Sequence, residues 1–174
     1  MRLETTVYRA HHPGWAWAPD SGEGARLYGG RFNPPRMAAL YTARRLETAW
    51  LEAQQGFPFK AQPMTICAYR VDCTDLRDLT DPAVLAAEGV APGDLACAWE
   101  ALADRGEAVP SWALARRLRA AGGAGIIVPS FARGAGPRDV NVVFWDWARE
   151  GSHQVVVIDD FGRLPRDDAS WRPA

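Results

Sequence analysis

Short segments in which hydrophobic and polar positions alternate predict β-strands on both sides of the middle of the chain. These segments are rich in β-branched and aromatic residues, which fit the pleated surface of a sheet. The predicted strands cover residues 5–10, 40–43, 64–71, 125–130, 141–146 and 154–159.

Helical spacing marks residues 46–55, where apolar residues recur at i, i+3 and i+4. Three more helices are predicted between the two groups of strands. Asp81, Asp94 and Ser111 stand before apolar-periodic segments and are the expected N-caps of these helices. Helices grouped between strands are typical of an α+β fold rather than an alternating α/β fold.

The length of 174 residues and the hydrophobic content of 48% are those of one domain with a core of its own. We therefore expect a single α+β domain over residues 1–174. Its central sheets are antiparallel or mixed, and residues from about 75 to 121 form a helical insert. No internal repeat or linker interrupts the chain.

Charge and cysteine usage exclude several classes of protein. The net charge of −1 argues against a nucleic-acid binder, which needs a basic face. The three cysteines form no CxxC pair, and no histidine has metal-ligand spacing, so no metal is expected. Neither a signal sequence nor an apolar run of membrane-spanning length is present, which predicts a cytoplasmic protein without membrane contact.

The candidate chemistry concentrates in residues 29–53, where Arg31, Tyr41 and Glu52 follow a glycine pair. Ser130 ends a predicted buried strand and joins this set. A guanidinium binds phosphates, an aromatic ring contacts a planar base, and a carboxylate stabilises an oxocarbenium ion. Together these groups suit cleavage of an N-glycosidic bond in a phosphate-bearing nucleotide.

From spacing alone, the structural alternatives are favoured. Arg31 is then a surface ion-pair partner, Glu52 a solvated helix carboxylate and Tyr41 a core tyrosine. No nucleophile elbow, zinc-protease or phosphate-loop motif competes for the active site.

Several motifs change this weighting, because their order and spacing resemble the RES-domain family, the toxin half of a bacterial toxin–antitoxin system. The motifs are Val7-Tyr8-Arg9, Gly30-Arg31-Phe32-Asn33, Ala39-Leu40-Tyr41, Ala49-Trp50-Leu51-Glu52, residues 125–130 ending at Ser130, and Asn141-Val142-Val143-Phe144. Arg31, Glu52 and Ser130 stand for the arginine, glutamate and serine that name the family. Tyr41 stands for its active-site tyrosine.

The resemblance implies a fold like that of diphtheria-toxin-type ADP-ribosyltransferases, with NAD⁺ as the substrate and no metal. By this resemblance Glu52, Arg31 and Tyr41 are catalytic. The same resemblance implies that Arg31, Tyr41, Ser130, Gly30 and Asn33 bind NAD⁺. Arg31 would hold the pyrophosphate or the nicotinamide ribose, Tyr41 would pack on the nicotinamide, and Glu52 would bond the ribose hydroxyls. Ser130 would contact the nicotinamide end or the ribose.

Three functions are compatible with the sequence. The expected one is a toxin that cleaves the nicotinamide–ribose bond and transfers ADP-ribose to a protein acceptor, which stops growth. The alternative is an NAD⁺ hydrolase or phosphorylase that depletes the NAD⁺ pool. A catalytically inactive binding module is a further alternative. The expected partner is a small antitoxin of the Xre type with a helix-turn-helix part.

Overall fold

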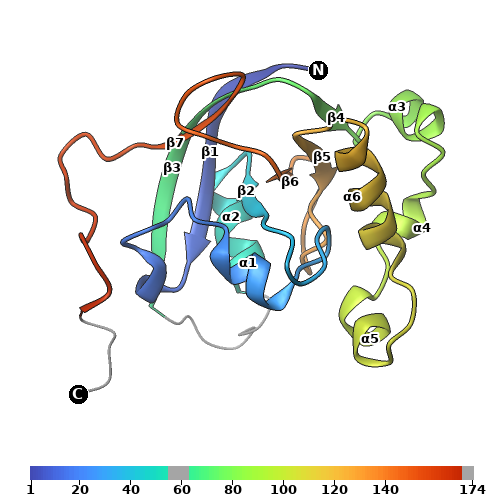
Figure 1. Ribbon diagram of the computed structural model, residues 1–174, viewed down its shortest axis with the longest axis horizontal. Coiled ribbons are helices and arrows are strands. Elements are labelled where there is room, and N and C mark those ends of the chain that lie inside the picture. Colours follow the sequence, from blue (N-terminus) through green and yellow to red (C-terminus); the bar gives the residue numbers. More distant parts are fainter. Residues whose placement is uncertain (55–62, 170–174) are drawn as a thin grey trace.

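A computed structural model describes residues 1–54 and 63–169, and its centre is one mixed β-sheet (Figure 1). The order of the seven strands across this sheet is β4-β5-β6-β2-β1-β3-β7. In chain order the strands are β1 (Leu3–His11), β2 (Leu40–Ala43), β3 (Thr65–Cys73), β4 (Leu76–Asp78), β5 (Gly125–Pro129), β6 (Val140–Phe144) and β7 (His153–Val157).

Antiparallel pairing dominates the sheet. The longest ladder joins β1 to β3 from Leu3↔Cys73 to His11↔Thr65. Strands β4 and β5 pair in parallel. Strand β2 lies between β1 and β6, so residues from the two ends of the chain meet in the middle of the sheet.

Helices pack against two parts of this sheet. The helices are α1 (Glu23–Tyr28), α2 (Leu46–Ala53), α3 (Pro82–Ala87), α4 (Pro92–Leu95), α5 (Trp99–Asp104) and α6 (Pro110–Ala120), with a 3₁₀ turn η1 (Pro13–Trp15). Helix α2 packs against β1 and β2. Helices α3 to α6 gather beside β4 and β5, on the right in Figure 1.

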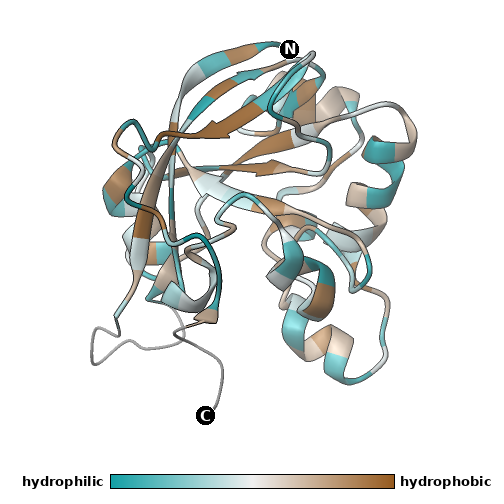
Figure 2. Ribbon diagram, turned by 60° about the vertical axis from the view of Figure 1, so that its left-hand side comes forward, coloured by the Kyte–Doolittle hydropathy of each residue, from teal (hydrophilic) through white to brown (hydrophobic). Residues whose placement is uncertain are grey.

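The apolar core forms two clusters on opposite faces of β5 and β6. Ile127 and Phe144 face one cluster, which includes Tyr69 and Val71 of β3. Ile126 and its neighbours on the other face pack against α4 and α6. Residues 126–128 and 142–144 are therefore buried on both faces of the sheet, which explains the apolar runs there and their hydrophobic colour in Figure 2.

The six predicted strands are confirmed with shifts of one or two residues at their ends. Strand β4 was not predicted, since three residues are too few to show a period. Helix α1 was also missed, because no helix was predicted before residue 46. The expected end of the 46–55 helix lies outside the described residues.

The helices of the middle region differ from prediction in two places. The helix expected to begin at Asp94 is two helices, because residues 96–98 separate α4 from α5, and Asp94 lies within α4, whose N-cap is Ala91. Helix α6 begins at Pro110, and its N-cap is Val109 rather than Ser111. The Ser111 side chain is fully buried and donates to the Arg31 carbonyl oxygen instead. The range 75–121 also contains β4, which is part of the sheet.

Within the described ranges, no helix has both the length and the apolar character needed to cross a bilayer.

Candidate active site

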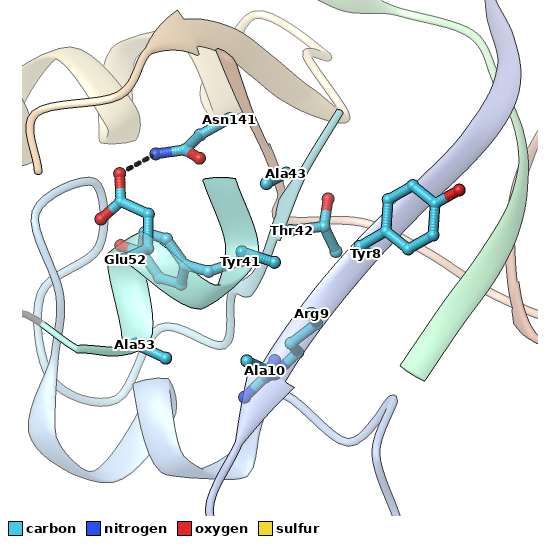
Figure 3. Close-up of a pocket in the computed structure, with 10 residues that line it drawn as sticks. Tyr8, Arg9, Ala10, Tyr41, Thr42, Ala43, Glu52, Ala53 and Asn141 are labelled. Atoms are coloured by element: carbon cyan, nitrogen blue, oxygen red, sulfur yellow. Dashed lines mark hydrogen bonds between the residues drawn. The ribbon is translucent and has the colours of Figure 1, made fainter. Parts of the chain in front are cut away.

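A pocket of about 260 Å³ opens where β1, β2, β6 and α2 meet (Figure 3). The strand registers Tyr8↔Ala43 and Ala43↔Asn141 place three of its residues in one row across the sheet. Helix α2 closes the pocket from the side. The lining residues are Tyr8, Arg9, Ala10, Tyr41, Thr42, Ala43, Ala49, Glu52, Ala53 and Asn141.

Glu52 is the acidic residue of this pocket, and two donors hold its carboxylate. Ser130 Oγ donates to Glu52 Oε1 at 2.6 Å. Asn141 Nδ2 donates to the same oxygen, as the dashed line in Figure 3 shows. Donors to a carboxylate make strong, short hydrogen bonds that orient it. The sequence-predicted pair Glu52 and Ser130, far apart in the chain, therefore meet at one oxygen.

A second contact fixes the helix that carries Glu52. Thr48 lies one turn earlier on α2, is fully buried, and donates its hydroxyl to Asp139 Oδ1 at 2.6 Å. The Asp139 carbonyl oxygen accepts the Ser130 N–H at 2.7 Å. Hydrogen bonds from the Gly136 N–H and from Thr48 lower the pKa of Asp139, which keeps it an ionised acceptor. Asp139 thus binds both the helix that carries Glu52 and the backbone of Ser130.

Tyr41 contributes its ring to the pocket and turns its hydroxyl into the neighbouring loop. The hydroxyl donates to Asn33 Oδ1 at 2.7 Å and accepts the Phe32 N–H at 2.9 Å. Burial raises the pKa of Tyr41 far above its ordinary value, so the phenol stays protonated. The hydroxyl is therefore a fixed donor to Asn33, and the ring is a rigid aromatic surface for a ligand.

Gly30 and Asn33 lie behind Tyr41 rather than in the pocket lining. A Cβ on Gly30 would lie 2.5 Å from the Tyr41 hydroxyl oxygen, so only glycine allows this approach. Asn33 is fully buried, and its amide nitrogen donates to the Ala25 and Met37 carbonyls, each at 2.8 Å. In this structure both residues support Tyr41, and their contact with NAD⁺ stays a prediction.

Arg31 points toward the helices of the middle region and is not a lining residue of the pocket. Its Nη1 donates to the Cys97 carbonyl at 2.6 Å. Its guanidinium carbon lies 4.9 Å from the centre of the Phe131 ring, within the range of a cation–π contact. The structure therefore brings Tyr41, Glu52 and Ser130 together, whereas the Arg31 side chain lies outside the pocket and contacts the helices of the middle region.

Arg9 is a pocket cation that sequence reasoning did not select. Its Nη1 atom is buried and has no hydrogen-bond partner among the described residues. Burial lowers the pKa of Arg9, and an arginine with so high a starting value still carries its charge. An arginine with a buried donor that has no partner is expected to bind an anion. The signal was present in the Val7-Tyr8-Arg9 motif, where Arg9 is the charged member.

Asn141 is the second missed residue. It opens the Asn141-Val142-Val143-Phe144 motif and donates to Glu52. Its Oδ1 atom is buried without a hydrogen-bond partner in the described part of the chain. This acceptor and the Arg9 donor are the two unsatisfied side-chain atoms that the described residues bury, and both residues line the pocket.

Comparison with known proteins gives three results. The family described as "RES domain" matches residues 6–167. Proteins named NAD(+) phosphorylase MbcT from Mycobacterium tuberculosis and Mycobacterium bovis are 35% identical over 130 residues, which cover 67% of this chain and 69% of theirs. The toxin–antitoxin complex MbcT–MbcA of M. tuberculosis contains a chain of similar fold, with a TM-score of 0.59 and 23% identity. The match covers 91% of this chain and 84% of that one.

These relatives correct the expectation of transfer to a protein acceptor. They are named phosphorylases, and a phosphorylase passes the cleaved group to inorganic phosphate. The residues that favoured NAD⁺ cleavage carry no information about the acceptor, which is why the sequence led to the wrong choice. The phosphorylase alternative agrees with the relatives.

Proposed function

The chain belongs to the RES domain family, and on that premise we propose that it is an NAD⁺ phosphorylase that acts as the toxin of a toxin–antitoxin module. The single observation that carries the proposal is the Glu52 carboxylate, held by Ser130 and Asn141 at the wall of a pocket that also contains Tyr41 and Arg9. The phosphorylase name of the relatives supports phosphate as the acceptor.

In the proposed reaction, the bond between the nicotinamide nitrogen and ribose C1 breaks, and nicotinamide leaves with the bonding electron pair. A phosphate oxygen forms the new bond to C1, which yields ADP-ribose 1″-phosphate. Positive charge develops on the ribose between these events. Glu52 stabilises that charge, since an oriented carboxylate next to an oxocarbenium-like centre needs no reorganisation during the reaction.

The other pocket groups bind and orient the substrates. Tyr41 presents an aromatic face to the nicotinamide ring. The unpaired Nη1 of Arg9 binds a phosphate oxygen, either of NAD⁺ or of the acceptor. Ligand pockets typically measure about 300 to 1,000 Å³. A volume of about 260 Å³ suits the nicotinamide ribose half of NAD⁺, and the adenosine half then lies outside this pocket.

The finer structural expectations belong to the same proposal. The fold is of the ADP-ribosyltransferase type, formed as one domain with the helices α3 to α6 as its insert. The protein acts in the cytoplasm, where NAD⁺ is available. Its partner is an antitoxin, which the similarity to a chain of a toxin–antitoxin complex supports. The helix-turn-helix part of this antitoxin is implied by the family resemblance.

Purified protein incubated with NAD⁺ tests the proposal directly, with phosphate varied against a phosphate-free buffer. Phosphorus NMR and chromatography follow the products. Nicotinamide release that depends on phosphate, with a product of three phosphorus resonances, is the expected result. Release that is equally fast without phosphate, with free ADP-ribose as the product, shows a hydrolase. Absence of release in both buffers leaves the binding module as the function.

A further inference from the structure

We infer that Ser111 and Trp112, at the start of α6, are positioning residues that hold the loop 30–33 in place. Through this loop they orient the Tyr41 ring at the edge of the pocket. The inference rests on the proposed function for its catalytic consequence. It gives the helical insert a part in the reaction that neither the sequence motifs nor the relatives assign.

Two neighbouring residues of α6 bind two neighbouring carbonyls of the loop. Trp112 Nε1 donates to the Gly30 carbonyl oxygen at 2.7 Å. Ser111 Oγ, fully buried, donates to the Arg31 carbonyl oxygen. The next carbonyl, that of Phe32, accepts Trp145 Nε1 at 2.9 Å. Three successive carbonyl groups of the loop are therefore fixed by side chains, two of them from the insert.

The side chain of Arg31 makes a further hydrogen bond between the loop and the insert, and here the loop supplies the donor. Its Nη1 donates to the Cys97 carbonyl between α4 and α5. The Ser111 hydroxyl also accepts a weak hydrogen bond from the Cys97 thiol at 3.3 Å. Loop and insert thus exchange donors and acceptors at three points, and neither moves freely without breaking hydrogen bonds.

The loop passes this restraint to the pocket through Tyr41. The Phe32 N–H and the Asn33 side chain both bind the Tyr41 hydroxyl. The Gly30 backbone packs so closely on that hydroxyl that a Cβ has no room. A shift of the loop therefore tilts the Tyr41 ring. Since Tyr41 faces the nicotinamide in the proposed function, the insert affects the affinity for NAD⁺ rather than the affinity for phosphate.

Ser111→Ala removes one donor with little change in packing volume, and Trp112→Phe removes one donor together with part of the indole ring. Trp99→Phe is the matched control, because Trp99 of α5 packs on the Trp112 ring with centroids 6.3 Å apart. Among the described residues Trp99 contributes no hydrogen bond to the loop. Hydrogen–deuterium exchange of the Gly30 and Asn33 amides and the two KM values, for NAD⁺ and for phosphate, are measured for each protein.

We expect both test variants to exchange the loop amides about tenfold faster, as loss of one buried hydrogen bond implies. In the same variants, the KM for NAD⁺ rises about fivefold to tenfold while the KM for phosphate stays within about twofold. The control changes neither. Partial unfolding alone lowers kcat and leaves both KM values unchanged, so it does not imitate this pattern.

If the loop amides exchange hydrogen at the wild-type rate in both test variants, the inference is overturned, whatever the activity of the protein. Faster exchange with an unchanged KM for NAD⁺ overturns the catalytic consequence. A wild-type protein without phosphorolysis refutes the proposed function instead, and the exchange data then decide the positioning role on their own.

Discussion

Ser130 Oγ lies 2.6 Å from Glu52 Oε1, although the two residues are 78 positions apart in the sequence. Helix α2 supplies one partner, and the residue directly after β5 is the other. Because Ser130 and Asn141 both donate to Oε1, the Glu52 carboxylate has a defined orientation beside the pocket.

Glu52→Gln is expected to reduce phosphorolysis of NAD⁺ by at least about 100-fold, because a neutral amide does not stabilise the developing positive charge. The side-chain oxygen of Gln still accepts the Ser130 hydrogen bond, so the fold is retained. Chromatography of released nicotinamide measures the loss. Glu47→Gln is the control, because Glu47 lies on the same helix with 70% of its side chain exposed. An equal loss in both variants contradicts the role of Glu52.

Arg9→Met is expected to lose activity and gain stability. The methionine keeps the apolar stem but removes a buried donor without a partner, a group whose burial typically costs about 1–3 kcal/mol. Urea unfolding and kcat/KM for NAD⁺ are the measurements. Arg70→Ala, at an exposed site on β3, is expected to change neither. A destabilised Arg9→Met variant would show that Arg9 serves the fold rather than a ligand.

Thr48→Val is expected to lower kcat by about tenfold, because loss of one buried hydrogen bond to an ionised acceptor frees the helix that carries Glu52. Valine has the shape of threonine, so packing is unchanged. Thr48→Ser keeps the hydroxyl and should keep most of the activity. If the valine and serine variants are equally active, the Thr48–Asp139 contact does not orient Glu52.

The third histidine of the chain makes the stability depend on pH. His153 Nε2 lies 3.1 Å from Asp75 Oδ2, and Nδ1 lies 2.9 Å from Asp146 Oδ2. The hydrogen bond to Asp75 raises the pKa of His153, and the bond to His153 lowers the pKa of Asp75. A protonated imidazole donates to both carboxylates, whereas a neutral one donates to one.

The sign of the effect follows from linkage. The raised histidine pKa gives a stabilisation that is fully present below about pH 6.5 and is lost as the pH rises through the folded-state value. The lowered Asp75 pKa gives one that is present above about pH 4 and is lost in acid. His153→Gln should therefore destabilise the protein more at pH 5.5 than at pH 9 in urea unfolding. An equal effect at both pH values contradicts the double contact.

The amino-acid sequence determined most of the local structure. Alternating apolar residues are enough to place a strand such as β1, and the Asp81-Pro82 pair predicted the start of α3 with its side-chain cap. Short elements were not predicted, because the three residues of β4 do not establish a period. The motifs also indicated Tyr41, Glu52 and Ser130, which the fold brings to one pocket or its edge.

Only the tertiary structure decided how these residues are oriented. Nothing local shows that Arg31 turns away from the pocket to the Cys97 carbonyl while Arg9 turns an unpaired donor into the pocket wall. The Ser111 hydroxyl, expected to cap α6, instead binds the Arg31 carbonyl. The physical reason is that a side-chain donor takes the best acceptor within reach, and strand order and helix packing bring that acceptor from a distant part of the chain.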